Sequence, residues 1–568
     1  MQRLTGAALA ATLVLGGLAP TSAMTGRHSS LGRDTASATA PLGFVATHTQ
    51  AMKLSNAIDV GSVNPAMPMV IVVGLTANKA AAEAELHHIY TKGDPQFHRF
   101  LTPQQFTAAF APSAASVTAV ESYLSSEGFK GISASPNRMT VRAQGSATQV
   151  ERAFATSIHN FSQNGKAVFA NTTAANVPAA LSDKVLAVLG LQNAPMIIPI
   201  QAPKAAVQTA ILKIANARLA ANHGRLTTAS QPCDGLQFIP AVGPPGSLGI
   251  PLPAFPPLPV GPCPGKGYYT NDFEGAYDDQ GDPTASHTVV AEFSEGNQAP
   301  LVSDLRLNEY VNGLRQVPVT IVPVDLQSPD TYGAGEWEMD TQVETGVAGD
   351  VKALYDYNVG SLIDNDITLA FNRWVTDDIA PIANASFGEC EYESEIDASM
   401  ALDDQILLEG LLQGQTLFAS SGDTGSACPN NALGNGDGPV GIPDVSYPAS
   451  SPYAEGAGGT SLFTGYTSDQ YFGEIGWYSG GGGISLFESA EFWQNPENPI
   501  NCPPEYCSLR TIVAGRRNPE RGTHRSGQRD GCRCGRLRMH LLPRRRPHGK
   551  CRHELGRAPL GRRLQPPG

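Results

Sequence analysis

The chain has 568 residues, which is enough for two or three domains. Its 41% hydrophobic and 16% charged residues can form buried cores, so a disordered or fibrous protein is excluded. The net charge of −13 hides a split, because residues 510–568 hold 17 basic and 3 acidic residues, whereas residues 1–509 hold 22 and 49. An acidic surface repels phosphate, so the main body excludes a nucleic-acid binder.

The N-terminus has the pattern of a secretory signal peptide, which we predict for residues 1–23. Arg3 precedes an apolar run, Ala7–Leu18, and small residues follow as far as Ala23. The run is too short to cross a bilayer as a helix, and a buried helix is the alternative interpretation. No later stretch is apolar enough to span a membrane, so we expect a soluble, secreted, extracellular monomer without membrane contact.

The main body contains an even number of cysteines, which in an exported chain suggests disulfide bonds. They are Cys233, Cys263, Cys390, Cys428, Cys502 and Cys507. Their spacing does not fit a zinc site, and the pairing stays open.

Residues 41–199 mix helical and strand patterns and predict an α+β domain. Ala80–Tyr90, Ser113–Glu127 and Ala147–Ser157 have helical periodicity, whereas Met139–Ala143 alternates like a strand.

Residues 200–264 predict an Ala-rich helix at 204–222, followed by a segment dense in Pro and Gly. Such a composition cannot form a regular core element and is typical of an exposed linker.

Residues 265–509 alternate short apolar runs with helical patterns, which predicts an α/β domain with a parallel sheet and flanking crossover helices. The expected strands are Val289–Phe293, Val319–Val324, Ile382–Ser386 and Thr416–Ala419.

Two carboxylates, Glu336 and Asp340, are four residues apart at the start of a helical pattern that runs through Val343, Val347 and Ala353. Both side chains project from one helical face. Close carboxylates do not ionise together easily, which suits a general base oriented by a second acid. A solvated acidic face is the alternative.

Small residues follow two of the expected strands, where the sites of parallel sheets collect. Ser386-Phe387-Gly388 ends one strand, and Ser421-Gly422-Asp423 ends another. The run Ser479–Gly483 has almost no side chains, so it can lie against a bound peptide or form an ordinary glycine loop.

These motifs resemble the sedolisins, the serine-carboxyl peptidases, which are subtilisin-like in fold. The propeptide resemblance depends on Asp94–Thr102, Phe106, Phe110–Pro112 and Ser146–Phe154. The catalytic resemblance depends on Tyr269-Thr270, Glu336–Asp340, Ser386–Gly388, Ser421–Asp423, Tyr447–Tyr453 and Gly458–Thr460.

The resemblance implies a role for each matching residue. Glu336 would be the general base, Asp340 would orient it, and Asp423 would stabilise the oxyanion in protonated form, which implies an acid pH optimum. Residues Ser386, Phe387 and Gly388 would bind substrate, together with Ser479, Gly480 and Gly481. The implied partners are protein or peptide substrates and the chain's own propeptide as an inhibitor.

The family's nucleophile is a serine in a Gly-Thr-Ser sequence near the C-terminus, and we find no such sequence after Arg510. Gly458–Ser461 contains a Gly-Thr-Ser sequence, but it lies where the family has a structural turn, well before the nucleophile. The family also binds calcium beyond the nucleophile, and we expect those ligands to be absent from this chain.

A reading-frame slip explains the tail, in which Arg occupies 16 of 59 positions. Residues 552–558, written in GC-rich codons and read one base later, give Gly-Thr-Ser-Trp-Ala-Ala-Pro. A genuine basic tail is the alternative. We therefore expect a secreted acid endopeptidase precursor that is inactive as translated, or alternatively a non-catalytic peptide-binding or inhibitory protein.

Overall fold

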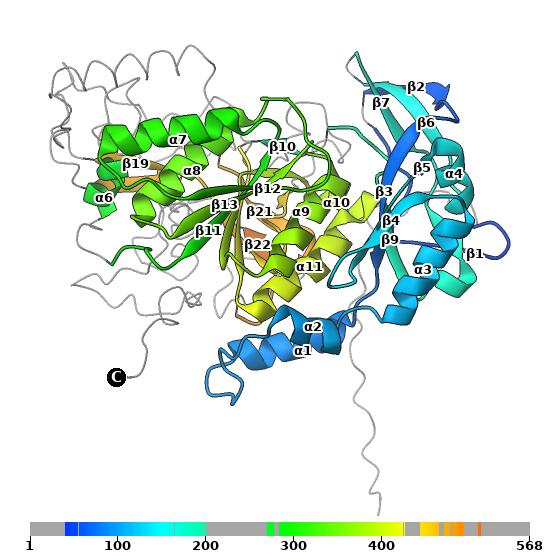
Figure 1. Ribbon diagram of the computed structural model, residues 1–568, viewed down its shortest axis with the longest axis horizontal. Helices are drawn as coiled ribbons and strands as arrows, with labels where there is room; N and C mark the ends of the chain where they lie inside the picture. The colour runs from blue at the N-terminus through cyan, green and yellow to red at the C-terminus, as the bar shows by residue number, and fades with distance from the viewer. Residues whose placement is uncertain are drawn as a thin grey trace, which may run out of the picture. The chain divides into compact units, whose positions relative to one another are not determined.

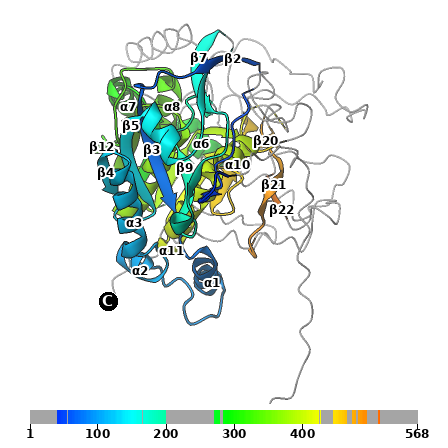
Figure 2. The same cartoon turned by 90° about the vertical axis from the view of Figure 1, so that its right-hand side faces the viewer.

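The computed structural model describes residues 40–199, 270–277, 283–423, 425, 444–464, 471–476, 480–493 and 509–512, except for 55, 164 and 196. The expected signal peptide, the Ala-rich helix and the Pro- and Gly-rich linker lie outside the described residues. The described residues belong to one compact unit with two main sheets (Figures 1 and 2), and two large clusters of buried hydrophobic residues form its core.

The N-terminal domain is built on antiparallel sheets, so the expected α+β domain is confirmed. Its main sheet has the order β4-β5-β3-β9, a second has the order β2-β6-β7, and β1 pairs with β8. The strands are β1 (Phe44–Ala46), β2 (Ala57–Ser62), β3 (Pro68–Leu75), β4 (Lys130–Ala134), β5 (Thr140–Ser146), β6 (Ile158–Gln163), β7 (Lys166–Asn171), β8 (Asn176–Pro178) and β9 (Val185–Leu189).

Local capping signals begin the helices of this domain. Thr102 and Ser146 each form a capping box at the start of a helix, and Ser113 caps a third. The helices are α1 (Lys79–Tyr90), α2 (Pro103–Ala109), α3 (Ala114–Ser126) and α4 (Ala147–Ala153), with a short 3₁₀ turn, η1 (Ala179–Leu181). The prediction of a helix as far as Ser157 is wrong, because Ala155 takes a left-handed conformation (φ 42°) that ends α4.

The second domain contains a six-stranded sheet in which all neighbouring strands are parallel, so the expected α/β fold is confirmed. Its order is β12-β13-β11-β14-β16-β18. The strands are β11 (Val289–Glu295), β12 (Val319–Pro323), β13 (Ala353–Val359), β14 (Ile382–Ala385), β16 (Thr416–Ser420) and β18 (Ala454–Ala457).

Helices follow the strands of the parallel sheet and flank it (Figure 1). They are α6 (Thr270–Tyr277), α7 (Ala299–Asn312), α8 (Ala334–Ala348), α9 (Asp364–Asp377), α10 (Glu391–Asp397) and α11 (Ser399–Gln413). The expected helix from Glu336 to Ala353 ends five residues early. Gly349 has a positive φ of 60°, and Ala353 instead begins β13.

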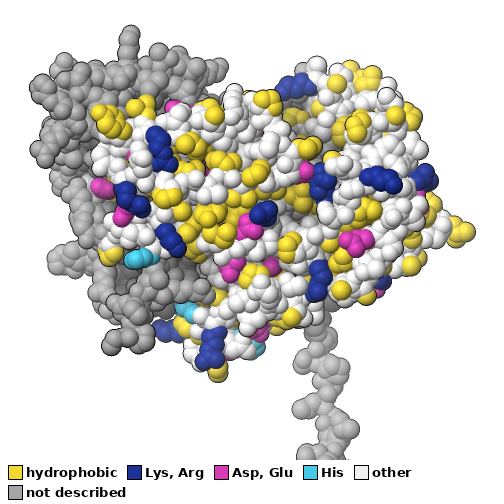
Figure 3. All heavy atoms as spheres, in the orientation of Figure 1, with side chains coloured by type: hydrophobic (Ala, Val, Ile, Leu, Met, Phe, Trp, Pro, Cys, Tyr) yellow, Lys and Arg dark blue, Asp and Glu magenta, His cyan; other side chains and the backbone are white. Residues whose placement is uncertain are grey.

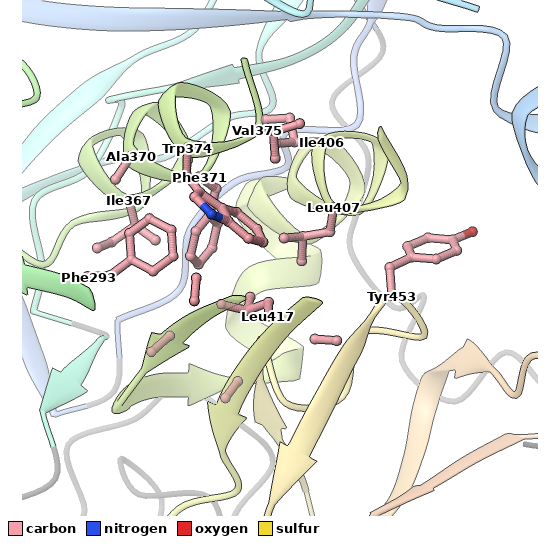
Figure 4. Packing of buried hydrophobic residues seen from close by; sticks show 14 of the residues in the cluster. Phe293, Ile367, Ala370, Phe371, Trp374, Val375, Ile406, Leu407, Leu417 and Tyr453 are labelled. Atoms are coloured by element: carbon pink, nitrogen blue, oxygen red, sulfur yellow. The ribbon is translucent and has the colours of Figure 1, made fainter. Parts of the chain in front are cut away.

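Helix α11 is buried on almost all of its sides. Packing against one sheet would bury only one side of a helix, so a second contact must cover the other. One side contacts α9 and the sheet, where Ile406 and Leu407 lie near Phe371 and Trp374 (Figure 4). The other side contacts α1 and α2 of the N-terminal domain. A single hydrophobic cluster therefore runs from Leu86 and Phe106 into the sheet domain.

The remaining described strands form small sheets: β10 (Ile198–Pro199), β15 (Phe387–Cys390), β17 (Ser446–Tyr447), β19 (Thr460–Thr464), β20 (Tyr471–Gly476), β21 (Gly483–Ser489) and β22 (Leu509–Ile512). Strand β22 pairs with β21 in antiparallel register, with Gly483 opposite Ile512. None of the described helices is long and apolar enough to cross a membrane.

Candidate active site

Helix α8 presents the two predicted carboxylates to the sheet. Glu336 and Asp340 are 1% and 6% exposed, so the alternative of a solvated acidic face is wrong. Their neighbour Trp337 is fully buried and packs edge to face on Phe387, with 6.2 Å between ring centroids. This packing fixes the helix against the sheet and turns both carboxylates inward.

Asn384, at the end of β14, connects Asp340 to the sheet. Its Nδ2 lies 3.0 Å from Asp340 Oδ2, 3.0 Å from Glu292 Oε2 and 3.1 Å from Ser386 Oγ. One amide therefore joins Asp340 of α8, a second carboxyl on β11 and the predicted substrate residue Ser386.

Three buried polar residues form a row across the middle of the parallel sheet. Glu292 on β11 is in register with Asp356 on β13 on one side and with Asn384 on the other. In-register residues of neighbouring strands face the same side of a sheet. The sequence alone did not identify Glu292, Asp356 and Asn384 as candidate site residues. A polar residue within each apolar run was the signal that could have identified them.

Burial favours the protonated form of the two carboxyls in this row, Glu292 and Asp356. The pKa of Glu292 is raised well above its usual range, first by burial and then by the charges of Glu344 and Asp340, against the opposing hydrogen bond from Asn384. Burial raises the pKa of Asp356 to about 7, although the Ser294 hydroxyl donates to it. The carboxyls beside Asp340 therefore bind protons readily in acid.

Asp423 lies just beyond β16, at the same sheet edge as the end of β14. The glycine run packs directly against this turn: Gly481 N donates to Gly422 O (2.6 Å), and the Ser421 hydroxyl donates to Gly481 O (2.8 Å). Gly480 and Gly481 are buried in this contact, and their predicted role in substrate binding stays a prediction. Ser479 lies outside the described residues.

The predicted substrate strand already has a backbone partner from this chain. After Ser386 the chain leaves the parallel sheet as β15, which pairs antiparallel with β10 through Ile198↔Gly388 and Pro199↔Phe387. Phe387 itself is buried against Trp337 and Phe371. The segment that follows the N-terminal domain thus pairs with the strand that we predict to bind substrate.

The structure brings Asp340, Asn384 and Ser386 into one hydrogen-bonded group and places Asp423 at the neighbouring strand end. The latent Gly-Thr-Ser of residues 552–558 lies outside the described residues. Cys390, which ends β15, is disulfide-bonded, and the other cysteines lie outside the described part of the chain.

The family resemblance implies calcium, so we tested the described acidic residues as ligands. Within the described ranges, no group of three or more His, Cys, Asp or Glu residues could hold a metal ion. We therefore derive no step that involves calcium.

Fold and site together define a precursor, in which an α+β domain docks on a parallel-sheet domain with a buried carboxyl pair. Residues 55–194 match the family model described as the Pro-kumamolisin activation domain. The chain is 33% identical over 470 residues to xanthomonalisin of Xanthomonas sp. (strain T-22), covering 75% of this chain and 51% of that protein. It is 32% identical over 444 residues to sedolisin of Pseudomonas sp. (strain 101), covering 75% and 67%.

A solved structure of Pseudomonas sedolisin, a serine-carboxyl proteinase complexed with two molecules of pseudo-iodotyrostatin, matches 44% of this chain and 69% of that one, with 32% identity and a TM-score of 0.39. On the sequence comparisons, this chain belongs to the sedolisin family of serine-carboxyl peptidases. It spans about half the length of xanthomonalisin and two thirds of sedolisin.

Proposed function

We propose that the chain is the precursor of a secreted endopeptidase that hydrolyses peptide bonds in acid. The observation that carries this proposal is the buried Glu336–Asp340 pair on α8, of which Asp340 is joined through Asn384 to Ser386 of the predicted substrate segment. A buried base oriented by a second carboxyl is what deprotonation of a serine hydroxyl requires.

In the active form of this mechanism, the serine oxygen bonds to the substrate carbonyl carbon while its proton passes to Glu336. Asp340 holds Glu336 in place, and a protonated Asp423 donates a hydrogen bond to the oxyanion. Glu336 then returns the proton to the leaving amine, and water releases the acyl group. Because Asp423 must keep its proton, this activity belongs to low pH.

We propose further that the chain as translated lacks the nucleophile, because no Gly-Thr-Ser sequence follows Arg510, whereas residues 552–558 written in GC-rich codons would encode one in the adjacent frame. Resequencing the 3′ end of the gene tests this. We expect the adjacent frame to stay open from near residues 510–516, to encode the nucleophile and then a stretch rich in Asp and Gly that could bind calcium. Early stop codons there would show that the basic tail is genuine.

A peptide-binding or inhibitory protein without catalysis is the second candidate, favoured by the pairing of β10 with β15. The purified chain, incubated with denatured protein at low pH, distinguishes the two. Release of peptides supports the peptidase and contradicts the loss of the nucleophile, whereas acid-dependent binding without cleavage supports the second candidate. In the peptidase, the same β10–β15 pairing supports a propeptide that inhibits its own catalytic domain.

A further inference from the structure

Acidic residues fill the interior of the sheet domain without matching bases. The buried acids are Glu292, Glu295, Glu309, Glu336, Glu338, Asp340, Asp356, Asp364, Glu389, Glu391, Glu393, Asp397, Asp403, Asp404, Glu409 and Asp444, and among the described residues no Lys or Arg is buried. On the face drawn in Figure 3, charged side chains stand singly among apolar and neutral ones. Much of the acidity is therefore internal.

The densest group lies beneath the substrate strand. A small cavity of about 10 Å³ is lined by Asp364, Glu389 and Asp403, together with Phe387. This volume is close to the lower limit for one water molecule. The Asp364 carboxyl also contacts Asp397. We call Asp364, Glu389, Asp397 and Asp403 the carboxyl cluster.

Four elements supply the cluster, each with its own local hydrogen bonds. Asp364 begins α9, Asp397 ends α10, Asp403 lies in α11 and Glu389 lies in β15. Hydroxyls donate to two members: Thr368 to Asp403 (2.6 Å) and Ser394 to Glu389 (2.5 Å). The backbone N–H of Ser399 donates to Asp397 (2.8 Å).

Two buried oxygens of the cluster, Asp364 Oδ1 and Glu389 Oε2, accept no hydrogen bond. Both belong to residues that line the cavity, and Asp364 and Glu389 contact each other. Two carboxylates in direct contact repel each other, whereas a protonated carboxyl donates a hydrogen bond to its neighbour. The geometry is therefore that of carboxyls that share protons.

The surrounding charged groups do not neutralise the cluster. Glu393 and Asp404, which act on Glu389 and Asp403, are both acidic. Lys79 pairs with Asp404, at 3.6 Å, and the Tyr447 hydroxyl also faces Asp404, at 3.3 Å. In the described ranges, no group of three or more acidic, His or Cys side chains has the geometry to hold a metal ion.

We propose that the carboxyl cluster holds protons in the folded chain, so that strand β15 is ordered in acid and loosens as the pH rises. Phe387 and Glu389 are two residues apart on β15 and both line the cavity, so charge in the cavity acts directly on this strand. The activation domain is tied to the same place, because Gln192 Nε2 donates to Asp364 Oδ2 (2.5 Å) before the chain pairs with β15 as β10.

The sign of the pH effect follows from burial. Burial is the largest cause that raises the pKa of all four carboxyls well above the usual range. A raised pKa in the folded state gives stability that is complete below the unfolded pKa and is lost as the pH rises through the folded pKa. The role of β15 in binding substrate rests on the proposed function. Whether β15 is ordered can be measured without substrate.

Hydrogen exchange of the full chain, followed by mass spectrometry from about pH 4 to about pH 9, tests the proposal. The measured quantity is the protection factor of β15 (Phe387–Cys390) divided by that of β3 (Pro68–Leu75), which removes changes in stability that the whole chain shares. We expect this ratio to fall with pH, on the order of tenfold per pH unit for each carboxyl that ionises. A ratio that stays constant overturns the proposal, whether or not the chain is a peptidase.

Variants locate the effect. Glu389→Gln and Asp364→Asn remove a charge at nearly constant shape, and each should flatten the fall of the ratio. Asp356→Asn is the matched control, because it removes a buried carboxyl on β13 and should leave the β15 curve unchanged. Native mass spectrometry of the wild type supplies a readout that needs no variant: a stoichiometric cation, lost on Glu389→Gln or Asp364→Asn, overturns the proposal.

Discussion

Asn137 of the activation domain donates a buried hydrogen bond of 2.6 Å to Glu409 of helix α11. The same amide reaches Asn372 on α9, also at 2.6 Å, and Gln413 donates to the other oxygen of Glu409. Burial raises the pKa of Glu409 to about 8, and the bonds from Asn137 and Gln413 oppose that rise. A titratable group therefore lies in the contact between the two domains.

The first prediction concerns the pH dependence of stability. Because the folded pKa of Glu409 is raised above its usual 4.5, its contribution is complete below that pH and is lost as the pH rises through about 8. Glu409→Gln should make the free energy of unfolding fall less steeply between these values. Urea denaturation across the pH range measures it, and an unchanged slope would contradict the assignment.

The second prediction concerns the partner in this contact. Asn137→Ala leaves Glu409 buried with one donor fewer, so the chain should lose about 1–3 kcal/mol of stability. The loss should be larger above pH 8, where Glu409 carries charge. Denaturation of the variant at two pH values checks this, and an equal loss at both would show that the hydrogen bond does not depend on the charge of Glu409.

The third prediction concerns Gly481. A Cβ there would lie 1.7 Å from the carbonyl oxygen of Ser421, so Gly481→Ala must displace the turn that leads to Asp423. We expect a loss of about 1–3 kcal/mol, as for other overpacked sites. Gly410→Ala in α11 is the matched control, because its nearest neighbour, Val375, is 3.4 Å away. Thermal unfolding that ranks the two variants equally would rule out the clash.

The fourth prediction concerns the proposed catalytic residues in a chain with the reading frame corrected. Glu336→Gln, Asp340→Asn and Asp423→Ala should each lower kcat more than they change KM. The loss for the oxyanion donor should be about 10²–10³-fold. Peptide hydrolysis measured in acid is the assay. Full activity of Asp423→Ala would exclude its role, and a maximum at alkaline pH would exclude the carboxyl mechanism.

The fifth prediction concerns release of the activation domain. The frame-corrected chain should cleave itself at low pH within about residues 227–266, in the Pro- and Gly-rich segment. N-terminal sequencing of the acid-treated protein identifies the cut. A mature start before Ile200 would contradict the interval, because a cut in the interval releases β10 together with the activation domain.

Local sequence was sufficient for the elements and for the carboxylate pair. Ser113 and Ser146 begin helices through their own side chains, and the apolar run at Val289 forms a buried strand, so these predictions needed no distant partner. The spacing of Glu336 and Asp340 fixed them on one helical face. Even so, the predicted end of α8 was wrong, because Gly349 takes a positive φ that ends the helix. The periodicity of apolar residues does not reveal such a turn.

Contacts between distant residues decided the rest. Asn384 connects to Asp340 and Glu292 only because β11, β14 and α8 meet, although 44 and 92 residues separate them along the chain. The carboxyl cluster likewise needs α9, β15, α10 and α11 together, and burial then changes the acids that sequence presents as ordinary charges. Composition records how many carboxylates the chain has, but only packing determines which of them lose water and keep their protons.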